Sequence, residues 1–544
     1  MLAISLFSFI IAVPIFAKRI SATVFSRILS IIFLFSAVLT WNSLYYFPIN
    51  NGVGIFSGLF QVSSITLGFQ LLVFVTSALI LFAWGPVPTH YHYLDNKAKI
   101  PVESTQIQIN SNFIHYNTIR EYNLITLFAV IGSCLLISSY NFVSMYMAIE
   151  LQSLAAYILC TLYRDSESAT SAGLKYFLLG SLASTIIVLG AGIVYAGTGI
   201  TNFEDLAILI SVGDYGSDPS FVSVCTLGGI LLIGIGYIFK VGAAPLYNWA
   251  PDVYDGVPTI VTTWVSTMPK IGILVVLLNI SFITTGYNFG WAQDSLSSIY
   301  TVYGQSFQTL LLVCSVLSFI IGSIVGLSQV RIKRLLTFST INHVGFLLLA
   351  LAVSTEESIE GFSFYLIQYT LTNVNTFLTL LAFGYVSKGV IERNKVREFT
   401  LLDDLKGQFF TNPLLAISFS VSLFSMTGIP PLMGFFAKQL VLYSVSYNYS
   451  FVAIIAIVMS VISASYYIKI VQLMFFNKDY ASVVNSKNEE PDMVSMTPGK
   501  GQPLITSSHS TVITILTFII AFYLLDPSIL LNSCKLLSLS LFNS

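Results

Sequence analysis

Long apolar segments recur along the chain of 544 residues and are separated by polar loops. A helix needs about 20 mostly apolar residues to cross the hydrocarbon core of a bilayer. Segments of this kind begin near residues 2, 28, 66, 122, 142, 169, 222, 257, 306, 336, 360, 412, 451 and 510. The pattern predicts an all-α polytopic membrane protein with about fourteen transmembrane helices. The Gly- and Asn-rich stretch 48–64, between the second and third spans, is either a hairpin or a loop.

The composition supports this fold class and excludes several functions. Hydrophobic residues make up 55% of the chain and charged residues only 9%, and the mean hydropathy is +0.82. A formal net charge of −1 leaves no electrostatic footprint for nucleic acid. The five cysteines are far apart, so they form no ligand set for zinc or an iron–sulfur cluster. We expect no metal or cofactor on this chain, and we expect the first apolar segment to be a retained span and not a signal peptide.

The charges of the loops predict how the spans cross the membrane. Lysine and arginine accumulate in loops on the side from which a membrane protein is inserted. Loops after odd-numbered spans are basic, for example at Arg120, Arg331 and Lys395, and we refer to their side as the basic side. Loops after even-numbered spans are acidic, for example at Glu204 and Asp294. The alternation places both termini on the side opposite the basic loops.

Two of the spans are interrupted. The seventh contains Lys240 shortly before Pro245, and the twelfth contains Gly428 and two prolines shortly before Lys438. Paired interrupted spans that each contain a buried charge are typical of repeated units with ion sites at the breaks. Spans 4 to 8 and 9 to 13 form two five-helix units, and an odd number of spans inverts the second unit relative to the first. The predicted divisions are 1–121, 122–284, 306–476 and 477–544.

One acidic residue and one lysine lie within the fifth and sixth spans. Glu150 is the only charge of its span, and Lys175 lies about a turn and a half into the next. Ionisable groups at such depth are rare and usually mark ion pathways. The structural alternatives are a packing ion pair for Glu150 and, for Lys175, an amine that extends to the membrane interface. We expect the two residues to pair with one another.

Three more lysines and a histidine lie within predicted spans: Lys240 before its helix break, Lys270 directly after Pro269, His343, and Lys438. A lysine in mid-membrane costs roughly 2.5–3.5 kcal/mol or more, so a functional role outweighs chance for the three lysines. His343 is either a hydrogen-bonded core residue or a proton carrier, because imidazole titrates near neutral pH. Lys469, by contrast, lies near the basic-side end of the thirteenth span and extends to the interface.

These residues suggest a proton relay. A buried amine loses its proton more readily than an exposed one, and a neighbouring carboxylate favours the charged form. We interpret Glu150 and Lys175 as a switch, and Lys240, Lys270, His343 and Lys438 as a lateral path for protons through the middle of the membrane. The chain contains no redox centre, nucleotide loop or catalytic triad, so the driving force comes from a partner or a counter-ion gradient.

Glycines within the sixth and seventh spans indicate close helix packing and not a phosphate-binding loop. They are Gly190, Gly192, Gly234 and Gly236.

Four segments resemble one protein family: KYFLLGSLAS, FKVGAAPLYNWAPDVYDGVPT, RIKRLLTFSTINHVGF and SMTGIPPLMGFFAKQLVL. In this order they are similar to the antiporter-like subunits of respiratory complex I. The resemblance implies fourteen helices in two inverted five-helix repeats with broken seventh and twelfth helices. It also implies that Glu150 and Lys175 are a coupling pair, that Lys240 and Lys270 are central relay lysines, and that Lys438 is the terminal relay lysine. Family members often have a histidine where this chain has Tyr247, so a relay through this position would need water or the phenol in place of the imidazole.

The resemblance further implies a proton-translocating subunit of an NADH:ubiquinone reductase, without redox catalysis on this chain. FMN, iron–sulfur clusters and ubiquinone are expected on other subunits. The expected partners are other membrane-arm subunits, including neighbouring antiporter-like chains, and lipids. The expected location is the mitochondrial inner membrane, with the basic loops in the matrix and both termini in the intermembrane space. A subunit of a multi-subunit cation/proton antiporter is the main alternative, and a solute transporter is less favoured because no break presents a pocket of mixed polar groups.

Overall fold

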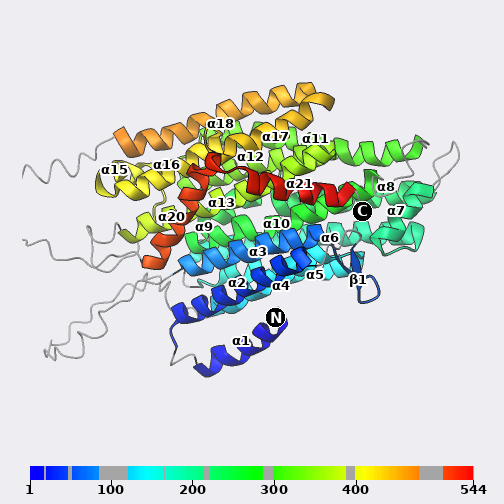
Figure 1. Ribbon diagram of the computed structural model, residues 1–544, viewed down its shortest axis with the longest axis horizontal. Helices are drawn as coiled ribbons and strands as arrows, with labels where there is room; N and C mark the ends of the chain where they lie inside the picture. Colours follow the sequence, from blue (N-terminus) through cyan, green and yellow to red (C-terminus); the bar gives the residue numbers. More distant parts are fainter. Residues whose placement is uncertain are drawn as a thin grey trace, which may run out of the picture.

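The helices of the chain form one bundle. In the computed structural model, the described residues are 1–16, 20–46, 52–84, 121–164, 166–212, 221–285, 298–386, 398–476 and 506–542. Most helices run along the long axis of the view, with α1 (Leu2–Phe16) and α18 (Ser450–Phe476) at opposite edges (Figure 1). The predicted all-α polytopic fold is confirmed. The polar insertion at 85–120 and the long loop at 477–505 lie outside the described residues.

A short hairpin follows the second helix, α2 (Ala22–Tyr46). Strands β1 (Val53–Ile55) and β2 (Phe60–Val62) pair antiparallel, which confirms the hairpin alternative for this stretch. The next helix, α3 (Ser64–Ala83), begins at a capping box. The Ser63 hydroxyl accepts a bond from the Thr66 backbone N–H, and the Thr66 hydroxyl accepts one from the Ser63 N–H at 2.8 Å.

The first predicted unit has the expected interrupted helix. Its helices are α4 (Glu121–Ser138), α5 (Phe142–Thr161), α6 (Glu167–Thr198), α7 (Phe203–Val212), α8 (Phe221–Val241), α9 (Trp249–Gly256) and α10 (Thr259–Thr285). The break between α8 and α9 begins at Gly242, whose φ of +79° suits glycine because other residues are strained there. Pro245 and Pro251 lie in and just after the break, where they disturb no continuous helix.

The second unit repeats this arrangement. Its elements are α11 (Ser298–Leu327), α12 (Ile332–Val353), α13 (Glu356–Val386), η2 (Leu402–Leu405), α15 (Gln408–Thr411), α16 (Pro413–Thr427), α17 (Met433–Asn448) and α18. The break between α16 and α17 again begins at a glycine with positive φ, Gly428 at +86°. Both predicted breaks are thus confirmed. The inverted relation of the two units and the division of the chain at 121, 284, 306 and 476 stay predictions.

Every predicted span start has a helix beside it, but the count of fourteen membrane crossings stays a prediction. Within the described residues, ten helices are long and apolar enough to cross a bilayer. Helix α13 is not among them, because buried residues such as Asn373 and Asn375 lower its hydropathy. Helix α16 has only 15 residues, since the break divides its span. The remaining helices are α20 (Ser507–Ala521), η3 (Tyr523–Leu525) and α21 (Ser528–Phe542).

Among the described helices of ten or more residues, two were not predicted. Helix α7 has only 10 residues, too few for a span, and places Phe203, Leu206, Ala207 and Ile210 on one buried face. Helix α21 has 15 residues and packs against α13 and α3. Both helices are too short to cross the bilayer, so neither gives a long apolar run in the sequence.

The contacts between loops agree with the predicted alternation of sides. Tyr140, after α4, donates its N–H to Leu59 O of the hairpin at 3.0 Å, and Phe203, after α6, donates to Tyr140 O at 3.2 Å. These loops all follow even-numbered spans. At the other end of the bundle, Ile332, after the ninth span, donates to Thr400 O, after the eleventh, at 3.0 Å. For these five loops the contacts join only loops that the alternation places on one side.

Helices α6 and α8 approach closely through glycines. A Cβ at Gly190 would lie 2.7 Å from Gly229 O, and a Cβ at Gly236 would lie 2.4 Å from the Ile187 side chain. Gly234 of α8 faces α11 instead, where its Cβ would lie 2.7 Å from Phe307. The packing interpretation is confirmed for these glycines. It is wrong for Gly192, which has no such atom within 4 Å.

Gly190→Ala is expected to lower the melting temperature of the purified assembly, because the added methyl group would push α6 away from the α8 backbone. Overpacking of this kind costs about 1–3 kcal/mol. The matched control is Gly192→Ala, which makes the same chemical change on the same helix where nothing lies within 4 Å. Equal melting temperatures for the two variants would contradict this account of the α6–α8 contact.

Candidate functional site: a row of buried cations

Glu150 pairs with Lys240 and not, as predicted, with Lys175. The Lys240 ammonium, at the end of α8, lies 3.6 Å from Glu150 Oε1 in the middle of α5. Lys175 on α6 instead forms an ion pair with Asp252 on α9. Lys240 is buried, whereas the side chain of Lys175 is 45% exposed. In this structure the carboxylate therefore stabilises the charge of Lys240.

The register of α5 and α6 explains why Lys175 does not reach Glu150. Tyr157 packs edge-on against Tyr176 and Phe177, with ring centroids 4.7 and 5.7 Å apart. Lys175 is therefore level with the last two turns of α5. Glu150 lies about two turns further along, roughly 12 Å along the axis at 1.5 Å per residue, which exceeds what the two side chains bridge directly. Spacing in the sequence alone does not reveal this offset.

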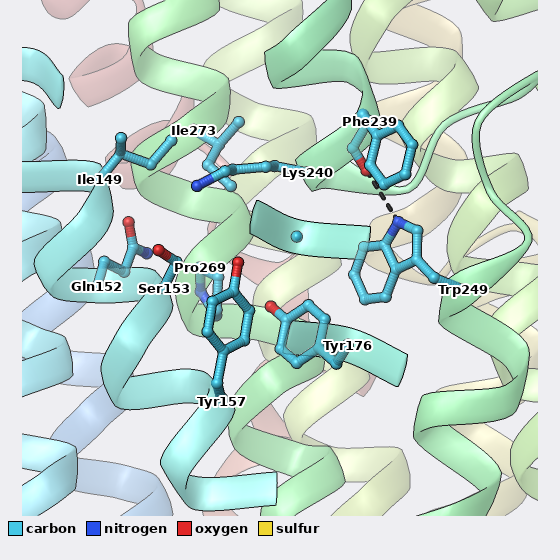
Figure 2. A pocket seen from close by; sticks show the side chains of 11 residues that line it. Ile149, Gln152, Ser153, Tyr157, Tyr176, Phe239, Lys240, Trp249, Pro269 and Ile273 are labelled. Atoms are coloured by element: carbon cyan, nitrogen blue, oxygen red, sulfur yellow. Dashed lines mark hydrogen bonds between the residues drawn. The ribbon is translucent and has the colours of Figure 1, made fainter. Parts of the chain in front are cut away.

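A small cavity lies beside Lys240, between α5, α6 and α8. Figure 2 shows Lys240 reaching toward α5, with Tyr157 and Tyr176 on the far side of the cavity. The cavity is lined by Ile149, Gln152, Ser153, Tyr157, Tyr176, Gly180, Phe239, Lys240, Trp249, Pro269 and Ile273. Its volume of about 20 Å³ is enough for a water molecule.

Several polar atoms at this cavity have no hydrogen-bond partner among the described residues. They are the Lys240 ammonium, Glu150 Oε1, and both the oxygen and the nitrogen of the Gln152 amide. A buried polar group without a partner costs about 1–3 kcal/mol, so such groups normally bind ordered water. The Gln152 amide and the Lys240 ammonium, which both line the cavity, therefore provide partners for a water there, and the geometry fits a hydrated site around Lys240.

The helix break beside Lys240 is stabilised by Trp249. Its indole N–H donates to Phe239 O at 2.9 Å, near the end of α8 where carbonyls lack the usual helical partner. The indole also stacks on Tyr176 at 4.8 Å. Non-helical backbone at membrane depth survives only where protein or water satisfies it, and Trp249 does so here. Tyr247, in the same break, is half-buried and packs edge-on against Phe338 at 6.0 Å.

Lys270 lies in the core of the bundle, on α10. Its ammonium donates to Thr340 Oγ1 of α12 at 3.2 Å and to Tyr369 OH of α13 at 3.3 Å. Among the described residues no carboxylate pairs with it. Pro269 has no N–H, which leaves Val265 O without its helical donor, and Tyr254 OH donates to this oxygen at 3.4 Å. The lysine is thus held by hydroxyl groups next to a weakened helix turn.

His343 has a hydroxyl group at each ring nitrogen. Its Nδ1 lies 2.7 Å from Tyr365 OH, and its Nε2 lies 3.4 Å from Tyr467 OH. The ring is also 6.0 Å from that of Tyr369, which binds Lys270. An imidazole with a partner on both sides can accept a proton at one nitrogen and release one from the other. The same contacts also satisfy a histidine of purely structural role.

Lys438 forms a hydrogen bond across the second helix break. Its ammonium donates to Thr427 O, the last residue of α16, at 2.8 Å, and so satisfies a terminal carbonyl at the negative end of that helix. It also lies 5.5 Å from the Phe346 ring, which stacks on Tyr365. Lys240 precedes its break and Lys438 follows its own, so the two lysines lie on opposite halves of their interrupted helices.

Together these contacts join five helices, α8, α10, α12, α13 and α17, from Lys240 to Lys438. The Lys240 cavity reaches Pro269, the residue before Lys270. Lys270 binds Tyr369, whose ring adjoins His343. Tyr365 then connects His343 with the aromatic stack beside Lys438. The structure therefore brings together five of the six predicted residues, namely Glu150, Lys240, Lys270, His343 and Lys438, and places Lys175 near the basic-side end of the bundle.

The tyrosines of this row were not among the predicted site residues. Tyr365 and Tyr369 are one turn apart on α13, and Asn373, one turn further, donates to Tyr369 OH at 3.4 Å. Polar residues at i, i+4 and i+8 form a stripe along one helix face, which is a signal that the sequence contains. Tyr467 and Asp252 have no comparable signal, because their roles depend on which helices become neighbours.

A second ion pair fixes the basic-side end of the bundle. Lys333, at the start of α12, donates to Glu398 at 2.5 Å and to Val257 O at 2.8 Å. Burial opposes the charge of Glu398, but Lys333 and the hydrogen bonds from Thr259 outweigh it and lower the pKa of this carboxyl below its usual value. The pair therefore ties α12 to the start of α10 at neutral pH.

Comparison with known proteins shows the family of the chain. Residues 139–463 match the family described as NADH:quinone oxidoreductase/Mrp antiporter, TM. This match covers more than half of the chain. The chain belongs to this family. The resemblance found in the four sequence segments is thus confirmed, and all six predicted site residues lie within the matched range.

Several members of the NADH:quinone oxidoreductase/Mrp antiporter family are similar over long stretches. NADH-ubiquinone oxidoreductase chain 2 of Rhizopus oryzae is 46% identical over 100% of both chains. Chain 2 of Marchantia polymorpha is 36% identical over 72% of this chain and 71% of its own. NADH-quinone oxidoreductase subunit N of Rhodospirillum rubrum is 36% identical over 66% of this chain and 68% of its own.

Solved structures of the family share the fold. A chain of respiratory complex I from Thermus thermophilus superposes with a TM-score of 0.67 at 23% identity, over 97% of this chain and 98% of that one. A chain of the Mrp complex from Dietzia superposes with a TM-score of 0.73 at 17% identity, over 100% of this chain and 96% of that one. At these identities the likeness establishes the fold alone.

Proposed function

We propose that this chain is a proton-translocating membrane subunit of respiratory complex I. NADH oxidation and ubiquinone reduction take place on other subunits of the assembly, and FMN and the iron–sulfur clusters belong to those subunits. The observation that carries the proposal is the row of buried cations, Lys240, Lys270 and Lys438, which hydroxyl groups and a histidine connect. Full-length similarity to chain 2 of Rhizopus oryzae supports the assignment to complex I.

In the proposed relay, burial of a lysine favours release of its proton, and pairing with a carboxylate opposes that release. Glu150 stabilises the ammonium of Lys240, so the protonated state of the relay is the one that this pairing favours. When redox chemistry elsewhere shifts this pair, a desolvated amine releases its proton more readily. Lys270, His343 and Lys438 then accept and pass the charge, with Tyr369 and Tyr365 as the hydroxyl groups between them. Each charge moved against the membrane potential costs about 2.3 kcal/mol per 100 mV, which the redox reaction supplies.

The proposed location is the mitochondrial inner membrane. Eukaryotic relatives named chain 2 support it, and the segregation of lysine and arginine supports an orientation with the basic side in the matrix. Both termini then face the intermembrane space. The partners are other membrane-arm subunits, including neighbouring antiporter-like chains, and lipids.

Lys240→Met is expected to leave the complex assembled and able to oxidise NADH, but to lower proton pumping per NADH by roughly tenfold or more, since a group that takes up and gives up the proton is lost. Pumping is measured as the pH change in liposomes that contain the purified complex. Lys469→Met is the matched control, because this lysine is exposed on α18. Normal pumping in the Lys240 variant would remove Lys240 from the pathway.

A cation/proton antiporter subunit is the alternative, because the Mrp complex chain shares the fold over the whole length. A native gel of mildly solubilised membranes, stained for NADH oxidation and probed for this chain, separates the two functions. We expect the chain to migrate with the NADH-oxidising band, far above the mass of one chain. Migration in a smaller assembly without that activity would favour the antiporter.

A further inference from the structure

The basic-side end of the bundle holds a cluster of exposed ion pairs around α9. Asp252 accepts hydrogen bonds from Lys175 of α6 and from Arg334 of α12. Asp255, one turn later, accepts from Arg331 of α12 at 2.6 Å. We call Lys175, Asp252 and Arg334 the α9 cluster. It links the first five-helix unit, which contains α6 and α9, with the second unit, which contains α12.

Helix α9 also forms one wall of the Lys240 cavity. Trp249, at its first turn, lines the cavity and stacks on Tyr176, the residue after Lys175. Asp252 lies less than one turn beyond Trp249 on the same short helix. The bonds from Lys175 and Arg334 to Asp252 therefore hold the helix that presents Trp249 to the cavity.

The exposure of the cluster allows its pairs to exchange. The side chains of Lys175, Asp252 and Arg334 are 45%, 33% and 38% exposed. Ion pairs of this kind are weak and break easily. The buried pair of Lys333 and Glu398, by contrast, holds the start of α12 in place, so Arg334 offers a fixed point against which α9 can move.

We propose that Asp252 is a positioning residue of the relay. By binding Lys175 and Arg334 together it holds α9 over the Lys240 cavity, and so it couples the second unit to the access of Lys240 to the basic side. This inference rests on the proposed function. It assigns to Lys175 a role in holding α9 beside the cavity, in place of the direct pair with Glu150.

The test is a set of variants in the intact complex, reconstituted in liposomes, with assembly checked on a native gel. Asp252→Asn is expected to lower the protons pumped per NADH about threefold, the scale of one weak ion pair, while uncoupled NADH oxidation is retained. Asp252→Glu is expected to pump normally, because its carboxylate can still bind both Lys175 and Arg334. The matched control is Asp403→Asn, which removes another exposed ion pair of the basic-side end, with Lys406, away from the cluster.

Three results would overturn the inference. The first is normal pumping by Asp252→Asn alongside impaired pumping by Lys240→Met. The second is equal impairment by Asp252→Asn and Asp252→Glu, which would indicate a requirement for the aspartate shape and not for its pairing. The third result applies if Asp252→Asn fails to assemble. Arg334→Gln is then tested in its place, and normal pumping by Arg334→Gln would overturn the inference. Normal pumping by Lys240→Met would instead contradict the proposed function itself.

Discussion

The buried ammonium groups constrain the whole bundle, because each must be stabilised where neither bulk water nor lipid can solvate it. The chain solves this in three ways. Glu150 neutralises Lys240, hydroxyl groups of Thr340 and Tyr369 hold Lys270, and the last carbonyl of α16 holds Lys438. None of these is a strong permanent pair, so each amine remains able to change its charge. A bundle with tight buried ion pairs would be as well packed but could not pass protons.

The helix interruptions serve the same purpose. A broken helix leaves carbonyls without donors, and these must be satisfied inside a membrane protein. Trp249 satisfies Phe239 O, Tyr254 satisfies Val265 O, and Lys438 satisfies Thr427 O. Each of these side chains also contacts or lines the row of cations. The breaks therefore bring polar backbone and titratable side chains to the same depth, and the glycines that begin them permit the turn.

The sequence predicted the fold and most of the site, because both depend on features that are costly within a membrane. Apolar segments, loop charges, paired breaks and isolated lysines each carry a strong local signal, so Glu150, Lys240, Lys270, His343 and Lys438 were found together. Pairing depends instead on the register of neighbouring helices. The offset between α5 and α6 places Lys175 beside Asp252 and not Glu150, and no pattern within either helix encodes that offset. The same holds for Tyr467, which reaches His343 from a helix 124 residues away in sequence.

In the proposed relay the buried lysines act by releasing protons and not merely by being positively charged. Lys270→Arg tests it most directly, because arginine keeps the charge but does not give up its proton at physiological pH. The measurement is the number of protons pumped per NADH oxidised by the assembled complex in liposomes. A relay predicts that the ratio falls while assembly and uncoupled NADH oxidation persist. An unchanged ratio in the assembled variant would contradict the account.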